Sequence, residues 1–248
     1  MDVGPLARAS EGGSRRFTTT RWSLILAAAD PQSPSAHEAL SSLCEIYWMA
    51  VYAFVRRTGA SIEDARDLTQ AFFTTVLEKG YFKHAQRERG RFRTFLLTAV
   101  AHFLSNQRKA DRALKRGGGQ TVLSLDVDDG ERRYQLDPAD TMTPERLFDR
   151  RWALAVLDQA MARLSERYVT PDRRRVFTTL KSFLGGHEPE SYSEAARSLG
   201  LTEGSFRVTL HRFRKQFAAS LRDVVRETVQ RPQEVEDELR YLLKSVGR

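Results

Sequence analysis

Residues 191–215 read SYSEAARSLGLTEGSFRVTLHRFRK and form the strongest structural signal in the chain. Ser191 and Glu194 have the spacing of a capping box, which predicts the start of a short helix. Gly200 can adopt the left-handed backbone conformation that a turn between two helices needs. Thr202 then caps a second helix, whose inward side chains recur every three or four residues: Phe206, Leu210, Phe213 and Phe217. The stretch predicts a helix-turn-helix.

The outward face of the second predicted helix suits the major groove of DNA. Gly204 and the short Ser205 would let the first turn of that helix approach base edges closely. Between residues 193 and 226, seven basic residues stand against three acidic ones. The outward face consists of Gly204, Arg207, Val208, His211, Arg212 and Lys215. An ordinary helical hairpin with a solvated basic face is the alternative interpretation.

The rest of the chain also reads as helices, because apolar residues recur at intervals of three and four and strand signals are nearly absent. Ser61 and Asp64 resemble a further capping box, and Thr143 with Pro144 marks another helix start. Three consecutive glycines at 117–119 end the helix that starts at Phe92. The expected fold class is therefore all-α, with two helical domains joined by a flexible acidic linker.

The expected divisions follow changes in composition along the chain. They are a disordered leader at 1–17, a first helical domain at 18–118, the linker at 119–143, a second domain with the helix-turn-helix at 144–226, and an amphipathic C-terminal extension at 227–248. The extension is expected to pack back on the second domain, or alternatively to modulate DNA binding.

The charge balance points to a polyanionic partner. The 248 residues include 40 lysines and arginines against 32 aspartates and glutamates, a net charge of +8. Such an excess is most often associated with nucleic acid, although a base-biased genome could also enrich arginine. A second basic surface is expected between residues 86 and 119, where nine basic residues stand against two acidic ones. Contacts of this kind with phosphates give affinity without sequence information.

Catalytic and metal-binding motifs are not found in the sequence. It contains no GxxxxGK[ST] or GxGxxG phosphate-binding loop, no HExxH and no GxSxG. The five histidines are scattered, and Cys44 is the only cysteine. We therefore expect no enzyme activity, no cofactor and no metal. The chain also has neither a secretory signal nor an apolar run long enough to cross a membrane, which predicts a cytoplasmic protein without membrane insertion.

Three segments in order resemble a known family. They are DARDLTQAFF at 64–73, RFRTFL at 91–96 and TEGSFRVTLHRFRK at 202–215. Together they look like bacterial RNA polymerase sigma factors of the small extracytoplasmic-function (ECF) type, over about residues 18–225. Such proteins have two of the conserved sigma regions, the second and the fourth, joined by a linker.

The resemblance implies a role for particular residues. Asp67 and Gln70 match polar contacts to the clamp of core RNA polymerase, although Ala71 replaces a glutamate that many relatives have. The helix after Phe92 matches the part that opens and reads the minus-ten promoter element, with Phe95, His102, Asn106, Arg108 and Arg112 as its contacts. Many relatives have tryptophan at the position of Phe95, and asparagine at that of His102. The helix-turn-helix matches the reader of the minus-thirty-five element, with Ser205, Arg207, His211 and Arg212 as its contacts.

The sequence therefore favours a promoter-specificity (sigma) subunit, with core RNA polymerase and promoter DNA as partners. An anti-sigma factor or another regulator is a further possible partner. The first alternative is a stand-alone helix-turn-helix transcriptional regulator, which would need neither the Asp67 and Gln70 surface nor the basic helix after Phe92. The second is a helical interaction protein or anti-sigma-like adaptor that does not bind DNA, and the two basic surfaces argue against it.

Overall fold

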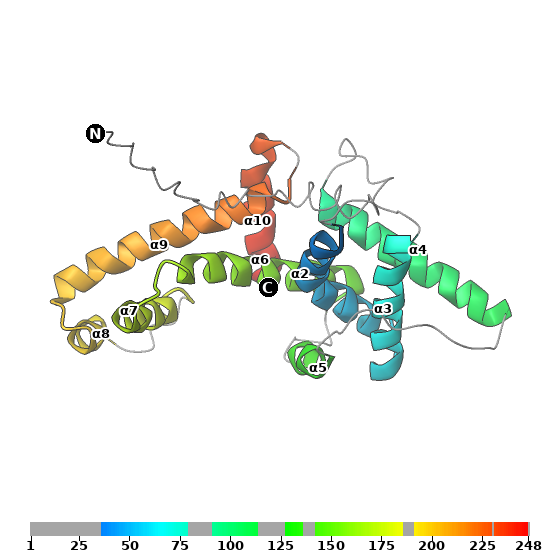
Figure 1. Ribbon diagram of the computed structural model, residues 1–248, viewed down its shortest axis with the longest axis horizontal. Helices are drawn as coiled ribbons and strands as arrows, with labels where there is room; N and C mark the ends of the chain where they lie inside the picture. Colours follow the sequence, from blue (N-terminus) through cyan, green and yellow to red (C-terminus); the bar gives the residue numbers. More distant parts are fainter. Residues whose placement is uncertain are drawn as a thin grey trace, which may run out of the picture.

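The structure is a computed structural model that describes residues 36–78, 91–113, 127–135, 142–185, 191–229 and 231–247. The predicted leader at 1–17 and residues 18–35 of the first predicted domain lie outside these residues. The described part contains helices and no strand, which confirms the all-α prediction (Figure 1).

The described residues form a series of helices along the chain. They are α2 (Ala36–Arg57), α3 (Ile62–Glu78), α4 (Phe92–Ala113), α5 (Val127–Gln135), α6 (Pro144–Ser165), α7 (Pro171–Ser182), α8 (Tyr192–Ser198), α9 (Glu203–Arg226) and α10 (Val235–Val246), with a 3-10 turn at Pro232–Glu234.

Helix α6 is the central element of the fold. Thr143 caps it by accepting a hydrogen bond from the backbone N–H of Arg146 at 3.3 Å, and Pro144 occupies the first turn, as the sequence predicts. Figure 1 shows α6 between α2–α4 at one end of the molecule and α7–α8 at the other, with α9 beside it. Both groups of helices are therefore built onto the same long helix.

Two apolar cores share α6. The first core joins α2, α3 and α4 to most of α6, from Leu147 to Ala160, to the end of α9 and to α10. The second joins the end of α6 to α7, α8 and the beginning of α9. The largest buried side chains of the first core are Tyr47, Tyr52, Phe72, Phe73, Phe92, Phe148 and Trp152, and those of the second are Phe183, Phe206 and Phe213.

The packing of α6 differs from the predicted division at residue 143. Phe148, Trp152 and Val156 lie in the first core, although the sequence assigns them to the second domain. The physical reason is that the apolar residues of α6 lie on more than one side of the helix. Two groups of helices can therefore pack against α6.

Helix α5 lies within the predicted linker. Glu131 binds Arg56 through two hydrogen bonds of 3.0 Å and accepts a third from the Tyr52 hydroxyl at 2.7 Å. Gly130 allows the helix to lie close to α2, because a Cβ at this position would be 2.8 Å from the Trp48 ring. This part of the linker is thus a helix docked on α2, while residues 119–126 and 136–141 lie outside the described residues.

The C-terminal extension is also packed. Helix α10 buries Val235, Leu239 and Leu242 against α6 and α9. Its Glu238 is buried too, and the carboxylate pairs with Arg91 and Arg93 at the start of α4. The extension therefore packs on α6 and α9 of the predicted second domain, as one of the two alternatives expects, and it also pairs with Arg91 and Arg93 of the first predicted domain.

Candidate nucleic-acid interface

The helix-turn-helix has the local geometry that the sequence predicts. The Ser191 hydroxyl accepts a hydrogen bond from the Glu194 N–H at 3.3 Å, and the Glu194 carboxylate accepts one from the Ser191 N–H at 3.1 Å. The bonds that the Ser191 N–H and hydroxyl donate to the Glu194 carboxylate hold the pKa of Glu194 below its ordinary value. Gly200 has a φ of +66°, and Thr202 caps α9 by accepting a bond from the Ser205 N–H at 3.2 Å. The turn and both caps are thus confirmed.

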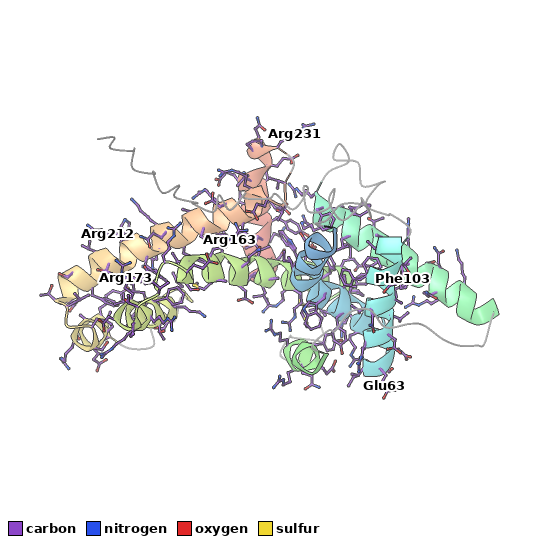
Figure 2. The ribbon with its side chains drawn as sticks, viewed as in Figure 1. Glu63, Phe103, Arg163, Arg173, Arg212 and Arg231 are labelled. Atoms are coloured by element: carbon purple, nitrogen blue, oxygen red, sulfur yellow. The ribbon has the colours of Figure 1, made fainter. Side chains whose placement is uncertain are left out.

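Helix α9 buries one face and presents the other to solvent. Phe206, Leu210 and Phe213 are buried in the second core. The predicted contact residues Ser205, Arg207, His211 and Arg212 are all exposed on the other side, together with Gly204, Val208 and Lys215. Figure 2 shows Arg212 on α9 at the same end of the molecule as Arg173 of α7.

Among the arginines of α9 that have partners within the protein, two lie close to the helix-turn-helix. Arg207 contacts Glu203 one turn earlier, with 2.7 Å between Nη2 and Oε1, and its guanidinium lies 5.0 Å from the centre of the Tyr192 ring. Arg214 donates a hydrogen bond to the backbone oxygen of Phe183 at 3.1 Å. Arg207 is therefore oriented on an exposed surface, whereas Arg214 connects α9 to the end of α7.

The second predicted surface, on α4, is less basic than the sequence suggests. Arg93 is buried and binds Glu238 and Asp149 at 2.8 Å each. Arg91 Nε lies 2.9 Å from the other oxygen of Glu238. These two side chains, counted among the nine basic residues of the surface, are thus neutralised by acidic groups far away in the sequence.

The predicted minus-ten residues lie along α4. Phe95 is half-buried and stacks on Phe92, with ring centres 6.1 Å apart. His102 and Asn106 are exposed and one turn apart, and Arg108 is exposed with a bond of 3.4 Å to the Thr58 oxygen. Arg112 belongs to α4, but its side chain lies outside the described part. Phe92 and Phe103 are buried in the first core, and Figure 2 shows Phe103 beside α3.

The predicted polymerase-binding residues lie on α3. The Ser61 hydroxyl caps this helix by accepting a bond from the Asp64 N–H at 3.0 Å. Asp67 is exposed, and Gln70 is half-buried. Phe72 and Phe73 anchor the opposite side of α3 in the first core. The helix therefore presents Asp67 on its outer surface.

Sequence reasoning did not single out a basic group on α7. Arg173, Arg174 and Arg175 are consecutive and exposed in the first turn of that helix, after the Thr170 cap. The ring of Phe177 packs on that of Phe213, with centres 5.7 Å apart, which attaches α7 to α9. The run of three arginines in the sequence could have predicted this basic group. In the structure, the run adds positive charge next to the helix-turn-helix.

The described residues contain neither a candidate metal cluster nor a candidate membrane span. Among them, no three histidine, cysteine or acidic side chains are grouped so that they could hold a metal ion. No helix in the described ranges has the length and apolar character needed to cross a membrane.

These observations define a class. Within the described residues the fold is helical, and a capped helix-turn-helix with a basic outer face is typical of DNA-binding transcription proteins. The family model for the ECF sigma factor matches residues 49–223, which is more than half of the chain. The protein therefore belongs to the ECF sigma factor family, with a role in promoter recognition and transcription initiation. No match to the chain was found among curated proteins or among solved structures.

Proposed function

We propose that this protein is a promoter-specificity subunit that binds core RNA polymerase, recognises both promoter elements and helps to open the DNA between them. The observation that carries the proposal is the exposed face of α9, a basic surface on a doubly capped helix-turn-helix within the family match. The protein would act in the cytoplasm by binding rather than by catalysis, without a cofactor.

Helix α9 would read the minus-thirty-five element in the major groove. Ser205 and Arg207 lie in its first two turns, the part of a recognition helix that meets base edges. His211 and Arg212 lie one to two turns further along and would contact bases or phosphates. The exposed positions of all four residues support this assignment.

Helix α4 would bind the minus-ten element after it opens. Extruding a base costs a few kcal/mol, which a surface for the exposed base can offset. The exposed His102 and Asn106 would surround such a base, with Phe95 beside them as an aromatic surface. Arg108 and Arg112 would contact the backbone of the strand.

Helix α3 would dock on core RNA polymerase through Asp67 and Gln70. The test is the double variant Asp67→Arg with Gln70→Ala, measured by co-elution with core polymerase in gel filtration. Asp158→Arg, which reverses an exposed charge on α6, serves as the matched control. Unchanged binding of the double variant would contradict the docking assignment.

The function itself is tested by run-off transcription with bacterial core polymerase, on DNA from the upstream region of the protein's own gene. The proposal expects a defined start that core polymerase alone does not give. A stand-alone regulator would instead bind DNA without core polymerase and would not co-elute with it. Absence of both the transcript and the core complex would therefore favour the stand-alone regulator.

A further inference from the structure

Val208 lies at the centre of the exposed face of α9. With 100° between successive residues of a helix, it points directly away from the buried stripe formed by Phe206, Leu210 and Phe213. Gly204 precedes it by one turn, and Arg212 follows it by one turn. The side chain is 51% exposed, so an aliphatic group stands in the middle of a polar, basic surface.

Neither the fold nor the helix requires valine at this position. The residues that attach α9 to the second core are on the opposite side of the helix. A β-branched residue is also a weaker helix former than alanine, leucine or lysine. An exposed valine in the second turn of α9 therefore contributes little to stability. A contact with a bound partner would account for an aliphatic side chain at this position.

The residues around Val208 do not cover its side chain. Gly204 has no side chain, and a Cβ there would meet no atom within 4 Å, so the backbone before Val208 is open to a ligand. Arg207 is drawn toward Glu203 and the Tyr192 ring. When the first turns of α9 enter a major groove, the methyl groups of Val208 are thus the central apolar contact.

The major groove offers one apolar group for such a contact, the 5-methyl group of thymine. We propose that Val208 contacts the 5-methyl group of a thymine in the upstream promoter element and so determines specificity at that base pair. The inference rests on the proposed function, in which α9 reads this element. It adds a residue that recognises DNA by an apolar contact to the four polar contacts proposed above.

The experiment uses the full chain bound to core polymerase and a promoter duplex mapped by run-off transcription. Each thymine of the upstream element is replaced singly by deoxyuridine, which lacks only the methyl group. We expect one replacement to weaken binding by about fourfold, the factor that corresponds to burial of one methyl group. Val208→Ala should bind the thymine and deoxyuridine duplexes equally at that position.

Val169→Ala is the matched control, because Val169 is 64% exposed and lies between α6 and α7, away from the face of α9. It should keep the fourfold difference. The inference is overturned if no deoxyuridine replacement weakens the wild type, or if Val208→Ala keeps the same penalty. Failure of the wild-type complex to protect the upstream element from nuclease would instead overturn the proposed function, and the inference with it.

Discussion

Glu238 of α10 and Arg93 of α4 form a buried ion pair, with 2.8 Å between the carboxylate Oε1 and the guanidinium Nε across 145 residues of sequence. Arg93 also binds Asp149 of α6, and its guanidinium lies 3.8 Å from the centre of the Tyr241 ring. The Tyr241 hydroxyl donates to Asp149, and burial together with this carboxylate raises the pKa of Tyr241. The Arg93 guanidinium thus connects α4, α6 and α10.

Glu238→Gln is expected to lower the free energy of unfolding by about 3 kcal/mol, because it removes one charge from a buried pair and leaves the other incompletely compensated. The side chain of Glu238 is only 1% exposed, so water cannot replace the lost carboxylate. The measurement is urea denaturation followed by circular dichroism at neutral pH.

Glu236→Gln is the control for this prediction. Glu236 is on the same helix and pairs with Arg222 at 2.9 Å, but both side chains are about half exposed. Exposed pairs contribute at most about 1 kcal/mol, so this variant should stay close to the wild type. Equal losses in the two variants would show that burial does not distinguish the two pairs.

Glu131 makes the docking of α5 dependent on pH. Hydrogen bonds from Arg56, and also from Tyr52, hold the pKa of Glu131 below its ordinary value of 4.5. A carboxylate with a lowered folded-state pKa stabilises the protein above pH 4.5, and that contribution is lost as the pH falls through the folded-state pKa. Wild type should therefore be more stable than Glu131→Gln at pH 7, and the difference should vanish in acid. Urea denaturation of both proteins from pH 7 to pH 3 checks this, and a difference independent of pH would contradict it.

The structure shows which features a sequence can predict and which need long-range contacts. The capping box at Ser191 and the turn at Gly200 were predictable, because each depends on residues within four positions of it. The pairing of Arg93 with Glu238 was not predictable from the sequence, because it depends on how α10 packs against the rest of the fold. Helix α5 was missed for a related reason: its residues are mostly polar, and it is anchored by contacts with α2 rather than by an apolar pattern of its own.

The candidate interface likewise has features that the sequence predicts and features that depend on long-range contacts. The outward face of α9 follows from helical periodicity, so its exposed residues were identified correctly. The charge of the α4 surface does not follow from composition, because counting arginines cannot show that Arg91 and Arg93 are bound to Glu238. Basic residues near a helix start are therefore weak evidence for a nucleic-acid surface until their acidic partners are known.

Arg207→Ala is expected to weaken binding to the upstream element by about 1–3 kcal/mol, if the guanidinium that Glu203 orients makes a bidentate contact with one base. The loss should depend on the sequence at a single position of the element. Arg222→Ala, an exposed arginine near the other end of α9, should have little effect. Binding to a set of duplexes with single substitutions measures this, and a uniform loss on all of them would identify a phosphate contact.

Gly200→Ala should destabilise the helix-turn-helix. The φ of +66° at Gly200 is a left-handed conformation, which costs a residue with a Cβ about 1–2 kcal/mol. A methyl group would meet no atom within 4 Å there, so backbone strain alone sets the cost. Urea denaturation measures it, and an unchanged midpoint would show that the turn can relax to another conformation.

Gly204→Ala should have opposite effects on stability and on DNA binding. Gly204 lies in the first turn of α9 with open space around it, so alanine should raise the free energy of unfolding by up to about 1 kcal/mol. The added methyl group would stand on the face proposed to approach base edges, and affinity for the upstream element should fall. Denaturation and duplex binding on the same sample test both effects. A variant that is more stable and binds equally well would show that the α9 backbone does not approach DNA closely at this turn.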